Sequence, residues 1–92
     1  MEMHQVRYFL ALCEERNFTR AAKRCGVAQP SLTRAIKQLE KKLGGSLFER
    51  DRVNTRLTDL GILVRPEFVQ IERSTAWGRI SDAAKRRPLS VE

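Results

Sequence analysis

The sequence has few of the residues on which metal and redox chemistry depend. It contains two cysteines, Cys13 and Cys25, and a single histidine, His4. Two cysteines make no disulfide framework, and a structural zinc site needs more convergent ligands than this set supplies. Both cysteines fall at apolar positions of predicted helices, where a thiol is usually a small, inert core residue. We therefore predict no metal, no cofactor and no redox role.

Long apolar runs and a catalytic pattern are also missing. No stretch approaches the ~20 apolar residues that cross a membrane. The beginning, MEMHQVRYFL, lacks a secretory signal because an acid and a histidine interrupt it. No nucleophile stands near a base, and there is no glycine-rich phosphate loop, so an enzyme is poorly supported. These absences predict a cytoplasmic protein that is neither an enzyme nor a membrane protein.

Acidic charge is scarce in one part of the chain. The segment 20–56 contains ten lysines and arginines but only three acids, whereas the rest of the chain holds eight basic and eight acidic residues. The net charge of +7 therefore belongs entirely to this segment. A basic surface confined to one segment indicates a polyanion as partner. The length of 92 residues allows one small domain with an appended helix.

Apolar spacing predicts three helices in the first half of the chain. Residues 3–15 show the i, i+3, i+4, i+7 pattern of one buried helical face. A short helix follows, with Asn17 as its N-cap and Gly26 as its left-handed C-cap. A third helix begins at Gln29, with a proline in its first turn, and stops at Gly44. Its predicted buried stripe consists of Leu32, Ala35, Ile36, Leu39 and Leu43.

The periodicity changes after the third helix. LFER and NTRL are short segments around a possible turn, which predicts a small β-hairpin over residues 47–57. Thr58 then offers an N-cap for a long helix from about Asp59 to Arg86. Pro66 lies inside this pattern and is expected to kink or locally weaken the helix.

The long fourth helix carries more apolar residues than a three-helix core is expected to bury. An apolar stripe without a partner in its own chain indicates a second chain. We therefore predict a homodimer through residues 58–86. The residues expected at its interface are Val64, Phe68, Ile71 and Trp77.

A short helix, a glycine-containing turn and a longer helix form the helix-turn-helix layout. In this layout the second helix enters the major groove of DNA by its N-terminal part. Polar side chains that suit base edges and phosphates lie near the beginning of that helix, mostly off the buried stripe. They are Gln29, Ser31, Thr33, Arg34 and Lys37. A hairpin carrying Arg50, Arg52 and Arg56 would form a wing against the DNA backbone or minor groove.

Two other binding functions compete with DNA recognition. A basic protein-interaction module could dock acidic partners, but docking needs charge and no polar QPSLTR opening. Single-stranded RNA readers stack bases on exposed aromatic side chains. Here the aromatic residues of the first half fall at predicted core positions, which disfavours RNA.

The segment NFTRAAKRCGVAQPSLTRAIKQLEKKLGGSLFER strongly resembles the N-terminal domain of LysR-type transcriptional regulators. The matching features are the AA pair, the V-x-QP-x-L-x-R opening, the LE and LG pairs, LFER and the later L-T-x-x-G. The likeness extends from about residue 3 to residue 70. It implies a mainly α winged helix-turn-helix domain over residues 1–57, with a three-helix core and a small β-hairpin wing. A linker and dimerisation helix would follow over residues 58–86.

The resemblance also implies how DNA would be bound. Antiparallel pairing of the long helices would space two recognition helices, residues 29–43, along an interrupted palindrome in double-stranded DNA. The wing, residues 47–57, would lie on the backbone or in the minor groove. The residues expected to approach DNA are Thr19, Arg20, Gln29, Pro30, Ser31, Thr33, Arg34, Lys37, Gln38, Arg50 and Arg52.

The sequence departs from the family pattern at two places within this region. Ala28 stands where the family often has serine, so a helix cap worth ~1 kcal/mol is lost. Val53 stands where an arginine is common, and the glycine near the wing tip is absent. Arg52 must therefore serve if a wing arginine contacts DNA.

The chain is also shorter than the family pattern. Family members carry a ligand-sensing domain after the linker helix, whereas residues 87–92 read as a tail or as the start of such a domain. We expect an excised DNA-binding fragment more than a naturally short relative. A small-molecule effector would bind only through the absent C-terminal domain.

Overall fold

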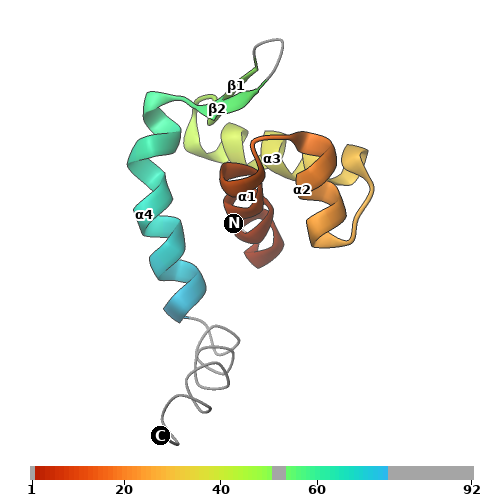
Figure 1. The fold of residues 1–92 in the computed structure, drawn as a ribbon. Coiled ribbons are helices and arrows are strands. Elements are labelled where there is room, and N and C mark those ends of the chain that lie inside the picture. The colour runs from red at the N-terminus through yellow and green to blue at the C-terminus, as the bar shows by residue number, and fades with distance from the viewer. Residues whose placement is uncertain (1, 51–53, 75–92) are drawn as a thin grey trace, which may run out of the picture.

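The computed structural model describes residues 2–50 and 54–74, which form a mainly helical domain (Figure 1). Its elements in chain order are α1 (Met3–Glu15), α2 (Phe18–Cys25), α3 (Gln29–Leu43), β1 (Phe48–Arg50), β2 (Thr55–Leu57) and α4 (Asp59–Ser74). The predicted winged helix-turn-helix fold is confirmed. The expected end of the fourth helix at Arg86 and the tail at 87–92 lie outside the described residues.

Helix ends coincide with the residues that the sequence marked as caps. Asn17 Oδ1 accepts a hydrogen bond from the backbone N–H of Arg20 at 2.8 Å, which caps α2. Gly26 and Gly44 end α2 and α3 with φ of 72° and 81°, a left-handed conformation in which a side chain costs energy. Thr58 Oγ1 accepts from Gly61 N–H at 3.1 Å and caps α4.

The core lies where α1, α2 and α3 meet, beneath the start of the hairpin. Phe9 is fully buried, and its ring packs against Phe48 of β1 at 5.3 Å between centroids. Both cysteines pack against this core and are partly buried, as their apolar positions predicted. The buried apolar residues of the three helices and the loop to β1 are Val6, Phe9, Ala11, Leu12, Ala21, Ala22, Leu32, Ala35, Ile36, Leu39 and Leu47.

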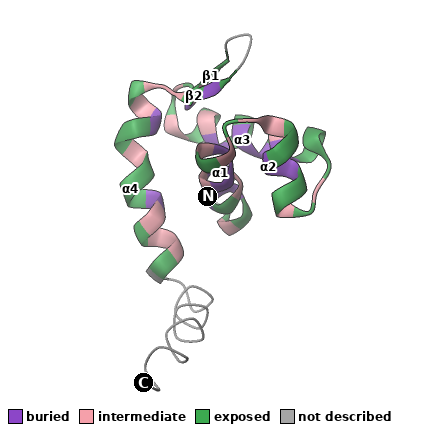
Figure 2. Ribbon diagram, in the orientation of Figure 1, coloured by how far each residue is buried: buried purple, intermediate pink, exposed green. Residues whose placement is uncertain are grey.

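The fourth helix packs against the core of its own chain, which corrects one prediction. Phe68 is only 3% exposed, and its ring meets Phe9 edge-on with centroids 5.0 Å apart. Val64 and Ile71 pack against the same core. The premise that these residues lack an intramolecular partner is therefore wrong, because α4 lies alongside α1 and completes the core (Figure 2). Trp77 lies outside the described residues.

Close approach between α4 and the hairpin depends on Gly61. A Cβ at this position would lie 2.4 Å from the backbone carbonyl oxygen of Leu47, a distance that no real contact allows. Glycine is therefore required where the L-T-x-x-G pattern places it. The contact places the first turn of α4 directly against the backbone that leads into β1.

The outer surface of α4 carries Pro66 and two exposed apolar side chains. The helix continues through Pro66 from Asp59 to Ser74, so the proline does not interrupt it, although it cannot donate to the carbonyl of Ile62. Ile62 and Leu63 are the large apolar side chains that the described part of the chain leaves exposed, at 60% and 71%. None of the described helices is both long and apolar enough to cross a membrane.

Candidate nucleic-acid interface

The outward face of α3 lines a groove that continues onto the wing. The groove has a volume of about 720 Å³. Seven residues that were predicted to approach DNA line it, and one further residue, Lys41, completes it. The lining residues are Gln29, Pro30, Thr33, Arg34, Lys37, Gln38, Lys41 and Arg50.

Helical periodicity explains how α3 serves both the core and the groove. Leu32, Ile36 and Leu39 are at most 3% exposed and hold the helix on α1 and α2. The groove residues lie on the opposite side of the same helix. Lys41 follows Lys37 by one turn and was missed, because the predicted site was restricted to the helix beginning. Extending the four-residue spacing by one step would have found it.

No side chain caps the N-terminal end of α3. Ala28 has the extended conformation of an N-cap, with φ −72° and ψ 147°, but no side-chain cap. The predicted loss of this cap is confirmed. Thr19 of α2 donates its hydroxyl to Gln29 Oε1 at 3.1 Å, which connects the two helices of the motif at this end. Ser31 is exposed beside them, outside the groove lining.

The wing contributes Arg50, whose position is set by an aromatic ring. Its guanidinium lies over the face of Phe18 at 3.8 Å from the ring centroid, a cation–π contact. Arg50 pairs with Thr55 in the antiparallel register of the hairpin. Arg56 forms an ion pair with Glu49 on the opposite strand. Arg52 and Val53 lie outside the described residues.

Three contacts fix the hairpin to the helices although its strands have three residues each. Glu40 of α3 accepts a hydrogen bond from the backbone N–H of Leu47 at 2.8 Å. Thr58 donates its backbone N–H to the Leu47 carbonyl at 3.0 Å. Thr55 donates to the carbonyl of Arg16 at the end of α1, at 3.1 Å. These hydrogen bonds attach the wing to α3, to the start of α4 and to the end of α1.

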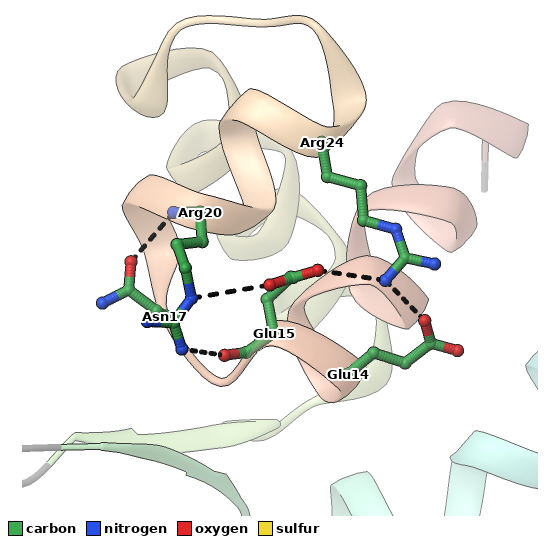
Figure 3. Close-up of polar contacts among 5 residues, drawn as sticks. All are labelled: Glu14, Glu15, Asn17, Arg20 and Arg24. Atoms are coloured by element: carbon green, nitrogen blue, oxygen red, sulfur yellow. Dashed lines mark hydrogen bonds and ion pairs between the residues drawn. The ribbon is translucent and has the colours of Figure 1, made fainter.

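Arg20, predicted to approach phosphate, is engaged within the chain (Figure 3). Its guanidinium donates to the carbonyl oxygen of Glu15 at 2.8 Å and lies 3.5 Å from the Glu15 carboxylate. The same carboxylate pairs with Arg24 at 3.2 Å, and Glu14 pairs with Arg24 as well. The two arginines and Glu14 are exposed and Glu15 is partly buried, so each pair is worth at most about 1 kcal/mol.

The two thiols are partly buried against the core and have raised pKa values. Burial raises the pKa of Cys13 from 9.0 to about 11, and burial likewise raises the pKa of Cys25. Both therefore remain protonated and weakly nucleophilic at neutral pH. Among the described residues, no cluster of three or more His, Cys, Asp or Glu side chains could hold a metal ion.

Comparison with known sequences gives a family match over most of the described chain. Residues 3–62 match the model of the bacterial regulatory helix-turn-helix proteins of the lysR family. The chain is 44% identical over 71 residues to a probable cat1 operon transcriptional activator of Acinetobacter lwoffii, covering 77% of this chain and 23% of that protein. It is 38% identical over 87 residues to the transcriptional regulator ClcR of Pseudomonas putida, covering 95% of this chain and 30% of ClcR. The chain thus spans less than a third of these relatives.

Solved structures show the same fold. The DNA-binding domain of BenM, in complex with catB site 1 DNA, superposes with a TM-score of 0.79 at 34% identity and covers 94% of this chain and 93% of that chain. The DNA-binding domain of CbnR in its DNA complex gives a TM-score of 0.78 at 35% identity and covers 96% of this chain and 99% of that chain.

Proposed function

Because the chain belongs to the lysR family of bacterial regulatory helix-turn-helix proteins, we propose that it reads double-stranded DNA with the groove of α3. The relatives named above are transcriptional regulators and not enzymes. The groove residues of α3 would enter the major groove, and the wing would lie on the adjacent backbone or minor groove. One observation carries the proposal. Seven of the residues predicted to approach DNA, six of them on α3 and the seventh Arg50 on the wing, line a single groove.

The chemistry of the groove suits both the bases and the backbone of DNA. Gln29 and Arg34 can form paired hydrogen bonds with adenine and guanine edges. Lys37, Lys41 and Arg50 supply positive charge for phosphates, which determines affinity more than sequence preference. The bound DNA complexes of the BenM and CbnR domains support this reading, because their fold superposes over most of this chain.

A homodimer would place two such grooves on an interrupted palindrome. We propose that Ile62 and Leu63, exposed on the outer side of α4, contribute to the pairing of two α4 helices. Phe68 is occupied within its own chain and belongs to the core instead. A small-molecule effector would act through a separate domain, and the protein would work in the cytoplasm at the nucleoid.

A salt titration with two labelled duplexes tests DNA reading. One duplex carries an interrupted palindrome selected from random sequence, and the other carries the same bases shuffled. We expect tighter binding to the palindrome at every salt concentration, with affinity for both falling steeply as salt rises. Equal affinities would reduce the chain to a basic domain that holds DNA without reading it. Absence of any DNA binding at low salt would favour docking to acidic proteins.

A further inference from the structure

Gln5 is a buried polar residue of α1 that lies outside the groove lining. It is 2% exposed, and its Nε2 donates to Oε1 of Gln38 on α3 at 3.1 Å. Its own Oε1 accepts a hydrogen bond from the backbone N–H of Glu2, also at 3.1 Å. A buried amide is costly unless both of its ends are paired. Both ends of Gln5 are paired, and one of them reaches a groove residue.

The direction of this series of hydrogen bonds is fixed at its first member. The backbone N–H of Glu2 can only donate, so it selects the carbonyl end of the Gln5 amide. The NH₂ end of Gln5 then faces Gln38, and because it too can only donate, it selects the Gln38 carbonyl. The NH₂ group of Gln38 is therefore the end of that side chain that is turned away from Gln5 and can donate to a ligand.

We propose that Gln5 is a positioning residue that makes Gln38 a hydrogen-bond donor to a DNA phosphate. This inference rests on the proposed DNA-binding function. Phosphate oxygens only accept hydrogen bonds, so an NH₂ group fits them and a carbonyl does not. Gln38 is exposed and lines the groove between Lys37 and Lys41, whose ammonium groups also suit phosphate. A Gln38 side chain without its buried partner could present either end.

A double-mutant cycle measures this coupling. The 92-residue chain is prepared as wild type, Gln5→Met, Gln38→Met and the double variant, and each is titrated with the selected palindrome. Methionine keeps the side-chain length but cannot form these hydrogen bonds. We expect Gln38→Met to weaken binding on the order of tenfold, since hydrogen bonds to charged groups are worth more than neutral ones. Gln5→Met should weaken it about threefold, and should add nothing to Gln38→Met.

The salt dependence separates this role from a charge effect. A lost amide contact releases no counterion, so the salt slope of both methionine variants should equal that of the wild type. Lys41→Met serves as the reference and should lower the slope by about one. Losses that add in the double variant, or a Gln38→Met variant that binds like wild type, would overturn the role of Gln5. Wild-type chain that binds no DNA would instead refute the proposed function.

A measurement on the unaltered chain covers the case in which Gln5→Met fails to fold. The side-chain amide signals of both glutamines are followed by NMR during titration with the duplex. We expect the Gln5 NH₂ protons to exchange slowly with solvent in the free chain, and the Gln38 NH₂ signals to shift strongly on binding. Gln38 signals that do not move at saturating duplex would overturn the inference.

Discussion

At the scale of single residues, replacing Arg34 distinguishes base recognition from nonspecific DNA binding. It is exposed and lines the groove, and its guanidinium can form two hydrogen bonds with a guanine edge. We expect Arg34→Ala to weaken binding to the palindrome by ~1–3 kcal/mol and to relax the base preference at one position. Binding selection from a random library, compared between variant and wild type, measures both effects.

The matched control for Arg34 is Lys37, one turn away in position but suited to phosphate. Lys37→Ala should weaken binding to palindrome and shuffled duplexes about equally and reduce the salt slope by about one. If Arg34→Ala also weakens binding to both duplexes equally, Arg34 contacts the DNA backbone and recognises no base.

Glu15 is predicted to restrain the DNA affinity of the chain through Arg20. Its carboxylate and carbonyl hold the Arg20 guanidinium, which was expected at a phosphate (Figure 3). Glu15→Gln removes the competing charge, so we expect tighter binding at low salt, with the gain shrinking as salt screens the phosphates. Duplex titrations at two or more salt concentrations measure it.

Glu14→Gln controls for the change in net charge. Glu14 pairs with Arg24, as Glu15 does, but not with Arg20. A larger gain in affinity for Glu15→Gln than for Glu14→Gln therefore isolates the release of Arg20. Equal gains would mean that Arg20 stays away from the DNA.

At the scale of the elements, α3 lacks a cap that a single substitution can restore. Ala28 already has the extended conformation of an N-cap residue. The N–H of Ser31, at the third helical position, now reaches only the Ala28 carbonyl, at 3.0 Å. A serine oxygen at position 28 could accept from that N–H, so we expect Ala28→Ser to raise the free energy of unfolding by ~1 kcal/mol. Urea unfolding followed by circular dichroism measures the change.

Ala28→Val is the control, because valine provides a side chain but no acceptor. It should leave the unfolding free energy unchanged or lower it. If serine and valine have the same effect, the gain does not come from a hydrogen bond at the helix end.

The wing illustrates why a short element needs its neighbours. Two strands of three residues are too short to be stable alone. The Glu40 carboxylate, the Thr58 N–H and the Arg16 carbonyl hold them through hydrogen bonds to their backbone and to Leu47. The sequence predicted the hairpin from a change in periodicity, but the hydrogen bond from Thr55 to the Arg16 carbonyl joins segments that are distant in sequence, so no local pattern contained it.

At the scale of the whole molecule, α4 has one face in its own core and another that we propose for a second chain. Leu63 is 71% exposed, so its replacement should leave the fold intact. We expect Leu63→Glu to shift the chain from dimer to monomer, because it places two charges in the paired interface. Sedimentation velocity, with circular dichroism to confirm folding, measures this. A dimer that survives the substitution would place the interface elsewhere.

Phe68 is the matched position on the inner face. Its ring is buried against Phe9 and only 3% exposed. We expect Phe68→Ala to lower the free energy of unfolding by ~3–5 kcal/mol, as large-to-small core substitutions of phenylalanine do. Denaturant unfolding measures the loss. A stable variant that becomes monomeric would restore Phe68 to the interface and contradict its assignment to the core.

The sequence by itself determined the helices, their caps and the family. These follow from local chemistry: apolar spacing sets the buried face, and Asn17, Gly26, Gly44 and Thr58 satisfy helix ends within a few residues. The outward position of the α3 residues that we propose to read DNA was also predictable, because a helix whose apolar stripe is known leaves its other face outward.

Only the tertiary structure decided where α4 packs and which residues support the site. Phe68 was assigned to a dimer because periodicity shows that a stripe is buried but not against what. The packing of α4 on α1, and the close approach of Gly61 to the Leu47 carbonyl, exist only in the folded chain. Likewise, Gln5 and Gln38 are 33 residues apart, and no spacing predicts their hydrogen bond. Packing between distant segments depends on the angle at which each element leaves the last, and that angle is a property of the folded chain.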